Sequence, residues 1–324
     1  CQYRRRNLEV ETMEYSTKEM SYDASSGEGR IFARGFAPAD KNAVRGILQI
    51  AHGMAEHSLR YESFAKYLVA KGFVVCVNDH AGHGKSAVDE ESFGYFGPGG
   101  YQNLVKDMNK LRRIIQEDFP SAPYMLMGHS MGSFLARRYL SDYGEGVSAA
   151  VLCGTSAGFS PAVMKMGLAY ANRIVMKEGP KAHDDQLKKL TTGGYNRSFQ
   201  PARTENDWLS RDEAQVDLYN QDPLCGFDFT VSGYRDLVTL LFDVNKPQWF
   251  RSVPTDFPIL MVSGDQDPVG DFGKGVRKVY HRLVKTGHDV KLILYPGGRH
   301  EILNETNRAQ VYEDIASFLL KATD

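Results

Sequence analysis

The stretch Gly128-His129-Ser130-Met131-Gly132 decides the fold, because it lies between an apolar run at residues 124–127 and a helical pattern that starts at Met131. In this context a sharp strand-to-helix turn lifts the serine oxygen out of the sheet, and a glycine two residues to either side permits the tight backbone. The N-terminus of the helix then presents amide groups and a positive dipole end to a developing oxyanion. Ser130 is therefore predicted to be a nucleophile at the edge of a sheet.

Short apolar runs alternate with amphipathic helical patterns on both flanks of this stretch. Continuously apolar runs predict parallel strands covered on both faces, and their alternation with helices predicts right-handed βαβ units. The expected strands are residues 46–51, 73–77, 124–127, 149–152, 258–262 and 290–295, preceded by a hairpin at 17–22 and 30–35. The expected helices are residues 61–71, 101–117, a segment after Met131, and 307–321. The pattern indicates an α/β fold around a mostly parallel sheet of eight strands.

One interval interrupts the alternation of strands and helices. From about residue 155 to residue 255 no strand is expected, and helical patterns occur at 163–176 and 232–243. An interval of this length is too long for a simple crossover between two strands. We therefore expect residues 1–154 and 256–324 to form one core, and residues 155–255 to form an inserted helical cap, or lid.

A serine at such a turn needs a base, because its hydroxyl is a poor nucleophile at neutral pH. The expected order along the chain is serine, acid and then histidine, with each residue on a loop after a strand. Of the nine histidines only His300 follows the last expected strand, whereas His281 and His288 precede it and are expected on the surface. Asp267, on the loop after residues 258–262, is the expected acid, and Asp265 is the alternative.

The oxyanion that forms during attack needs a second hydrogen-bond donor, which is expected on the loop after residues 46–51. Gly53 lets the backbone of this loop turn its N–H groups inward. The two donors are therefore assigned to the backbone amides of Met54 and Met131.

Two further patterns resemble ligand sites. His52, Glu56 and His57 resemble a zinc motif, but their spacing is H-x-x-x-E-H after a strand, whereas the H-x-x-E-H motif lies on a helix. Residues 82–86 resemble a P-loop, but Asp79 stands where the motif requires its first glycine. This second loop is expected to be a structural turn beside the mouth of the site. No metal ion or other cofactor is expected.

Composition argues against several classes of protein. Lys and Arg number 39 and Asp and Glu 40, and the resulting net charge of −1 argues against a nucleic-acid partner. Four cysteines without a C-x-x-C pair suit a reducing cytoplasm, and no stretch is expected to span a membrane. Cys1 leaves two interpretations open, a processed lipoprotein or, as we favour, a truncated or tagged chain.

Five motifs together resemble one family. They are HGMAEH at residues 52–57, DHAGHGKS at 79–86, GHSMG at 128–132, GDQD at 264–267 and GGRH at 297–300. These motifs are similar to those of the α/β-hydrolases of the monoacylglycerol lipase and lysophospholipase group, also labelled serine-aminopeptidase-like (S33). The resemblance covers about residues 30–320, interrupted by the cap. It implies an α/β-hydrolase fold with helices on both faces of the sheet, and hydrolysis of monoacyl lipid esters under a mobile helical cap.

The combined expectation is a serine hydrolase of carboxylic esters that works through an acyl-enzyme intermediate. Its preferred substrates are expected to be small amphiphilic esters, either monoacylglycerols or lysophospholipids. The cap residues Met164, Met166 and Met176 lie in an apolar segment that suits a flexible acyl chain, although each equally suits packing of the cap on the core. The cap is also a candidate for transient contact with a membrane surface.

Other functions stay open at this point. An aminopeptidase or a general carboxylesterase would use the same serine, acid and histidine. An aminopeptidase additionally needs carboxylates near the site to hold a free amine, and Asp207, Glu213 and Asp217 in the cap are candidates. The sequence leaves the oligomeric state open.

Overall fold

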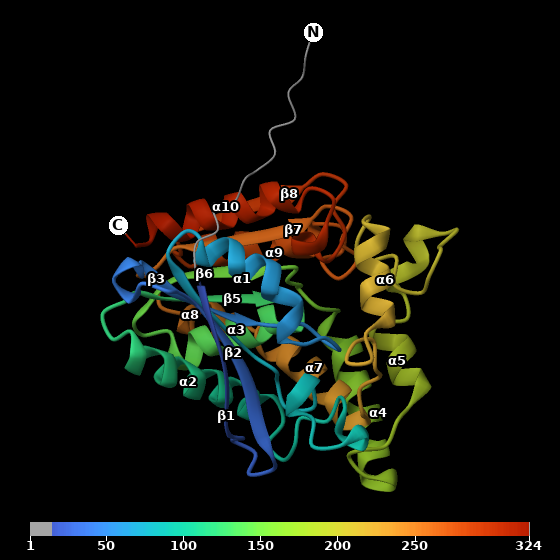
Figure 1. Ribbon diagram of the computed structural model, residues 1–324. Helices are drawn as coiled ribbons and strands as arrows, with labels where there is room; N and C mark the ends of the chain where they lie inside the picture. The colour runs from blue at the N-terminus through green and yellow to red at the C-terminus, as the bar shows by residue number, and fades with distance from the viewer. Residues whose placement is uncertain (1–14, 324) are drawn as a thin grey trace.

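A single sheet of eight strands forms the centre of the computed structural model, which describes residues 15–323 (Figure 1). Its strand order is β1-β2-β4-β3-β5-β6-β7-β8. The pairs β1–β2 and β2–β4 are antiparallel, and every other pair is parallel, so the predicted mostly parallel sheet is confirmed. The strands are β1 (Tyr15–Asp23), β2 (Arg30–Pro38), β3 (Gly46–Ala51), β4 (Phe73–Asn78), β5 (Tyr124–His129), β6 (Val147–Cys153), β7 (Ile259–Gly264) and β8 (Val290–Tyr295).

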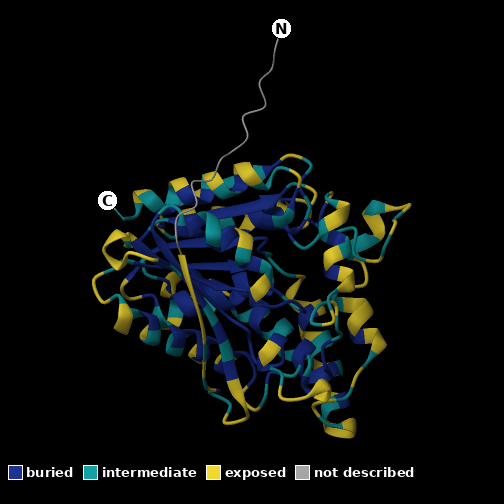
Figure 2. Ribbon diagram, viewed as in Figure 1, coloured by how far each residue is buried: buried dark blue, intermediate teal, exposed yellow. Residues whose placement is uncertain are grey.

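Helices cover both faces of this sheet. The side chains of each strand alternate between the two faces, so neighbouring residues of one strand pack against different helices. Met125 and Met127 of β5 join one buried cluster with residues of α1 (Glu62–Val69) and α10 (Arg308–Lys321). Leu126 joins the opposite cluster with residues of α2, α3, α8 and α9. Figure 2 shows the central strands as buried and β1 at the edge as mostly exposed. The bounds are α2 (Tyr101–Asp118), α3 (Met131–Tyr143), α8 (Pro247–Ser252) and α9 (Lys274–Lys285).

The helix α9 is absent from the sequence prediction. Its buried residues Val276, Val279 and Leu283 follow the spacing of one helical face, so the signal was available in the sequence. Short 3-10 turns complete the connections; they are η1 (Lys41–Ala43), η2 (Ser58–Tyr61), η3 (Gly84–Ser86), η4 (Glu90–Ser92), η5 (Tyr195–Phe199) and η6 (Ile302–Asn304).

Between residues 155 and 255 the chain forms helices and turns and contributes no strand to the sheet. Its helices are α4 (Pro161–Glu178), α5 (Asp185–Thr191), α6 (Glu213–Gln221), α7 (Val231–Asp243) and α8. Figure 1 shows α4 to α7 gathered on one side of the sheet. Both α7 and α8 also contact α3, and the indole N–H of Trp249 in α8 donates to the Arg137 carbonyl oxygen of α3 at 2.6 Å. This interval is therefore anchored on the core at its C-terminal end.

None of the helices within residues 15–323 combines the length and the apolar character that crossing a bilayer requires. The sequence prediction about Cys1 concerns a residue outside the described part of the chain.

Candidate active site

The turn between β5 and α3 holds Ser130 in a conformation that few residues other than glycine adopt. Its backbone has φ 53° and ψ −122°. A side chain at Gly128 would overlap the Gly132 carbonyl, and one at Gly132 would overlap the Ala51 carbonyl of β3. The Ser130 amide donates to the Cys153 carbonyl of β6 at 3.0 Å. The two glycines therefore let the turn pack against neighbouring backbone while the serine side chain points outward.

His300 and Asp267 face one another at the carboxyl edge of the same sheet. The His300 Nδ1 and Asp267 Oδ1 atoms are 2.9 Å apart, and both side chains are almost completely buried. The carboxylate also accepts hydrogen bonds from the Val269 amide at 2.9 Å and from the Ser263 hydroxyl at 3.3 Å. Because the carboxylate can only accept, Nδ1 carries the proton and Nε2 is left as the basic nitrogen. Burial alone would lower the pKa of His300, but the Asp267 carboxylate offsets it and the pKa is raised.

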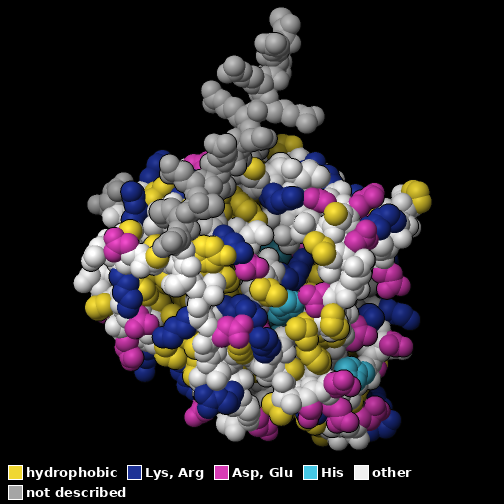
Figure 3. Space-filling view, in the orientation of Figure 1, with side chains coloured by type: hydrophobic (Ala, Val, Ile, Leu, Met, Phe, Trp, Pro, Cys, Tyr) yellow, Lys and Arg dark blue, Asp and Glu magenta, His cyan; other side chains and the backbone are white. Residues whose placement is uncertain are grey.

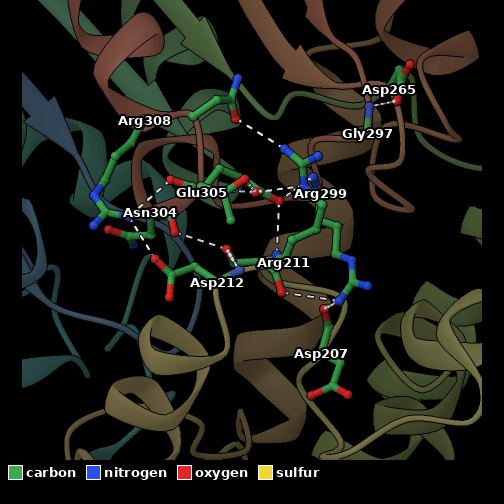
Figure 4. A network of polar contacts seen from close by, with 12 residues as sticks. Asp207, Arg211, Asp212, Asp265, Gly297, Arg299, Asn304, Glu305 and Arg308 are labelled. Atoms are coloured by element: carbon green, nitrogen blue, oxygen red, sulfur yellow. Dashed lines mark hydrogen bonds and ion pairs between the residues drawn. The ribbon is translucent and has the colours of Figure 1, made fainter. Parts of the chain in front are cut away.

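The alternative acid, Asp265, has a different partner. Its Oδ1 accepts the Gly297 amide at 2.8 Å, which ties the β7 loop to the turn after β8 (Figure 4). The structure therefore pairs His300 with Asp267. Of the two histidines expected on the surface, His281 is exposed. The prediction is wrong for His288, which is buried. Its ring nitrogens lie 3.2 Å from the carbonyl oxygens of Leu283 and Val253.

The loop after β3 bends back toward Ser130. The Gly53 amide donates to Glu56 Oε1 at 2.5 Å, and Ala55 has a positive φ of 52°. Within residues 15–323 no acceptor is found for the amide of Met54 or of Met131. Both residues border the same cavity as Ser130. Two free amides beside a serine oxygen are the arrangement that can stabilise an oxyanion.

A buried ion cluster connects this loop to His300, and the sequence prediction missed it. Arg60 Nη1 lies 2.6 Å from Glu56 Oε2 and 2.6 Å from Glu301 Oε1, and Nη2 lies 2.7 Å from Glu301 Oε2. Burial opposes ionisation of Glu56, but Arg60, with His129 and other neighbours, lowers its pKa to about 2. No local pattern reveals this cluster, because Arg60 and Glu301 are 241 positions apart in the chain.

Ser130, His300, Met54 and Met131 line one cavity of about 940 Å³. Much of its wall comes from the interval 155–255, through the apolar residues Phe159, Trp208, Leu209, Phe227, Leu237, Val238 and Leu241. Of the two roles left open for the α4 methionines, contact with the acyl chain is wrong, because none of them lines the cavity. Met164 is buried in packing, whereas Met166 and Met176 are 73% and 89% exposed.

Trp208 is a second residue that the sequence prediction missed. Its indole lies against the His300 ring, with centroids 5.1 Å apart, and its carbonyl oxygen accepts the His300 amide at 3.4 Å. On the other side the ring of Tyr195 lies 4.9 Å from the indole. Trp208 is one of only two tryptophans in the chain, which was the one available signal.

A polar network holds the Trp208 segment against the His300 loop (Figure 4). Glu305 Oε1 accepts the amides of Arg299 at 2.9 Å and Arg211 at 3.1 Å, and its Oε2 accepts Arg211 Nε at 2.9 Å. Arg308 Nη1 lies 2.8 Å from Asp212 Oδ2. These contacts fix the loop that carries His300 to the neighbouring segment of the interval 155–255.

The two patterns that resembled ligand sites have structural partners. His52 Nδ1 lies 2.8 Å from the Gly53 carbonyl oxygen, and His52 Nε2 accepts the His80 amide at 2.9 Å. Glu56 binds Arg60, as described above, so the H-x-x-x-E-H residues point to separate groups. At Gly84, in the second pattern, φ is +47° and a side chain would overlap the Asp79 carboxylate, which accepts the Lys85 amide at 2.8 Å. This loop is a tight structural turn.

Comparisons with known proteins agree with this geometry. The chain is 29% identical to the monoacylglycerol lipase of Mycolicibacterium smegmatis, over 85% of this chain and 88% of that protein. It is similar to the crystal structure of a thermostable carboxyl esterase from Bacillus coagulans, with 36% identity, a TM-score of 0.89, and coverage of 95% and 99% of the two chains. A structure described as a lipase in its open form is 29% identical, with a TM-score of 0.86, and covers 95% of this chain and 100% of its own.

The α/β-hydrolase fold predicted from the sequence is thus confirmed, both by the eight-stranded sheet and by the similarity to solved hydrolases. The family model described as serine aminopeptidase, S33, matches residues 42–307, which is most of the chain. The protein therefore belongs to the serine aminopeptidase S33 family of α/β-hydrolases.

Proposed function

We propose that this protein is a serine hydrolase that cleaves the carboxylic esters of monoacyl lipids. The observation that carries the proposal is the meeting of the Ser130 turn and the Asp267–His300 pair at one large cavity with an apolar wall. A small set of polar groups in an apolar pocket suits an amphiphilic ester, whose acyl chain is recognised by burial. The relative from Mycolicibacterium smegmatis, a monoacylglycerol lipase, supports the same substrate class.

The proposed chemistry begins with attack of Ser130 Oγ on the ester carbonyl. His300 Nε2 takes the serine proton, and the imidazolium that forms is stabilised by Asp267. The amides of Met54 and Met131 donate to the oxyanion of the tetrahedral intermediate. His300 then returns the proton to the departing alcohol, leaving an acyl-enzyme on Ser130. Water repeats the sequence with His300 as base, which releases the fatty acid and restores the serine.

We propose that residues 155–255 act as a cap that determines which esters enter. Its residues supply most of the apolar wall, whereas the core supplies the reacting groups. The interval is tied to the core by polar contacts such as that of Arg211 with Glu305, and by apolar packing, because Phe229, Leu240 and Trp249 belong to the same buried cluster as Leu135 of α3. We propose that its wall is the part of the site that selects acyl length.

Of the two alternatives, the aminopeptidase has weaker support. Asp207 is bonded within its own turn by Thr204, and Glu213 and Asp217 face Arg203 at the surface. None of these three candidate carboxylates lines the cavity. A general carboxylesterase is favoured by one observation, the 36% identity to a carboxyl esterase. Acyl-chain preference separates this alternative from the lipase.

We also propose that the cap contacts membrane surfaces and that the enzyme works in the cytoplasm. Val163, Met166 and Met176 of α4 are largely exposed apolar side chains, which can insert among lipid headgroups. Figure 3 shows both signs of charge intermingled over the visible face, so we expect apolar insertion to dominate over charge attraction. Binding to phosphatidylcholine vesicles should fall when Met166 and Met176 are replaced by Asp.

The proposed cytoplasmic location is supported by the cysteines. Cys76, Cys153 and Cys225 are free thiols, which suits a reducing compartment.

The decisive experiment compares Ser130→Ala with a matched control, Ser141→Ala, in the helix α3 that follows Ser130. The Ser141 hydroxyl bonds only within α3 and its neighbour Asp142, so its loss should leave turnover unchanged. Rates are measured on p-nitrophenyl esters of increasing length, monoacylglycerols, lysophosphatidylcholines and aminoacyl amides. We expect Ser130→Ala to lose at least about 10³-fold in turnover and to lose labelling by a fluorophosphonate probe. Undiminished esterase activity in Ser130→Ala would falsify the assignment.

A further inference from the structure

One histidine, one aspartate and one cysteine meet where the loop after β3 touches the turn after α6. His57 Nε2 lies 2.8 Å from Asp222 Oδ2. One ligating atom from each of His57, Asp222 and Cys225 lies within 4.8 Å of the other two. The His57 side chain is 6% exposed and that of Asp222 is 30% exposed, so the cluster is shielded but has a route to solvent. The proposed hydrolysis uses none of these side chains.

Hydrogen bonds of the backbone fix the two segments that carry these three residues. Asp222 Oδ1 accepts the Leu224 amide at 2.9 Å, and the Asp222 carbonyl accepts the Cys225 amide at 3.0 Å, so these two residues share one tight turn. The turn is attached to the core, because the Gly226 amide donates to the Ala55 carbonyl at 3.0 Å. His57 follows Ala55 by two positions and therefore keeps a fixed place relative to the turn.

We propose that His57, Asp222 and Cys225 form a binding site for a zinc ion. Imidazole nitrogen, carboxylate oxygen and thiolate sulfur are all preferred zinc ligands, and three of them leave a fourth position for water. Around a tetrahedral zinc ion such atoms are about 3.3–3.7 Å apart. The His57–Asp222 separation opens slightly to reach this range, and side-chain rotation brings Cys225 Sγ to it. His57 and Asp222 are 165 positions apart in the chain, so no local sequence motif reveals the complete site.

The thiol chemistry distinguishes a zinc site from a simple His57–Asp222 hydrogen bond. Cys225 is a free thiol, whereas zinc binds cysteine as the thiolate. Zinc binding breaks the S–H bond, forms a zinc–sulfur bond and releases the proton to solvent, with no change in oxidation state. Metal uptake by this cluster must therefore be accompanied by release of about one proton from Cys225.

An ion at this position would join the turn after α6, in the proposed cap, to the oxyanion loop, which is the loop after β3 that carries Met54. Gly226 and Phe227, directly after Cys225, line the cavity, and so do Met54 and Ala55, shortly before His57. Zinc would thus cross-link the two walls of the cavity entrance. The inference concerns metal binding and does not depend on which ester the enzyme cleaves.

The test titrates the full-length protein with Zn²⁺ and, separately, with Co²⁺ as a spectroscopic substitute. We expect about one Zn²⁺ per chain, release of about one proton, and a cobalt–thiolate charge-transfer band in the near ultraviolet. Cys225→Ser should abolish the band and the proton release. Both Cys225→Ser and Asp222→Asn should weaken Zn²⁺ binding by at least about 10-fold. The matched control is Asp217→Asn, because Asp217 faces Arg203 on the exposed side of α6, and it should bind Zn²⁺ like the parent.

Two results would overturn the proposal. The first is a parent protein that shows no cobalt–thiolate band, a measurement that needs no variant and is unaffected by any folding defect. The second is Zn²⁺ binding that persists undiminished in Cys225→Ser, which would assign the ion to other groups such as His300. Circular dichroism of each variant verifies that lost binding is not lost folding.

Discussion

Replacing Arg60 by Met tests how the site is held together. The guanidinium lies 2.6 Å from Glu56 and from Glu301, and the ring of Tyr219 covers it at 4.9 Å. Glu56 in turn fixes the Gly53 amide, at the start of the oxyanion loop, and Glu301 directly follows His300. Met fills the space of the Arg stem but leaves both buried carboxylates without a cation. The change therefore perturbs both halves of the proposed active site through one side chain.

The magnitude follows from the burial of the cluster. Removing one partner of a buried ion pair destabilises a protein by about 3–5 kcal/mol. The Glu56 pKa gives a similar figure: a drop from 4.5 to about 2 corresponds to about 3 kcal/mol at 1.36 kcal/mol per unit. Because this folded-state pKa is depressed, its stabilisation is complete above about pH 4.5 and disappears as the pH falls toward 2.

The variant should respond to pH in the opposite sense. Two buried carboxylates without Arg60 have raised pKa values, since burial and their mutual repulsion both oppose ionisation. They become protonated as the pH falls, which relieves the unpaired charge. The stability difference between parent and Arg60→Met should therefore be largest at neutral pH and should narrow in mild acid. Loss of the fixed oxyanion loop should also lower kcat by about 10²-fold, with a smaller change in KM.

Denaturant unfolding at pH 7 and pH 5, together with ester kinetics, measures both effects. The matched control is Arg138→Met, which removes a half-exposed pair with Asp142 at 2.8 Å and should cost no more than about 0.5 kcal/mol. If Arg60→Met unfolds at the same denaturant concentration as Arg138→Met and keeps its kcat, the cluster does not support the site and the reasoning fails.

Three further predictions concern the proposed reacting groups and their frame. Asp267→Asn should reduce turnover by about 10³–10⁴-fold, because the His300 tautomer is lost, whereas Asp265→Asn should stay within about tenfold; equal losses would contradict the choice of acid. Only the neutral imidazole of His300 accepts the serine proton, so its raised pKa places the acidic limb of the pH profile of kcat/KM above pH 6.5. An acidic limb below pH 6 would refute this prediction. Gly132→Ala should lower the free energy of unfolding, measured in urea, by at least about 1–3 kcal/mol through overlap with the Ala51 carbonyl. Gly167→Ala, at a position of α4 with open space around it, should be neutral or stabilising.

The central strands could be predicted because they are buried on both faces, as β3 is along its whole length, whereas the edge strands β1 and β8 are partly exposed. Largely apolar runs such as residues 46–51 and 290–295 have the length of a strand and are too short for a typical helix. Both strands begin and end at the predicted residues. Chain order then brings His300 and Asp267 to one edge, since the loops after parallel strands meet there. His288 was misplaced because a loop position says nothing about burial. It lies at the opposite edge, where two carbonyl oxygens surround it.

Contacts between distant segments could not be predicted by the same means. Arg60 with Glu301, and His57 with Asp222, are joined only by the folded chain, and each residue alone reads as an ordinary surface charge or polar group. The Arg60–Glu301 pair forms within the core, whereas the His57–Asp222 pair joins the core to the interval 155–255, so both pairs require the folded chain. Burying a charge is costly unless a partner is present, so these residues depend on the complete fold for their role.

The cap shows why apolar composition alone does not identify a binding wall. A helix of the core separates two environments, the interior and water, and one apolar face is enough to orient it. A cap helix borders three environments, because its apolar residues can face the core, the cavity or the outer surface. In α4 Met164 faces the packing and Met166 faces outward, while Phe159, just before the helix, reaches the cavity. Two of the three methionines, Met166 and Met176, therefore lie on the outside of α4, where a monoacyl lipid would first be met in its bilayer, and their exposure is the basis for proposing membrane contact there.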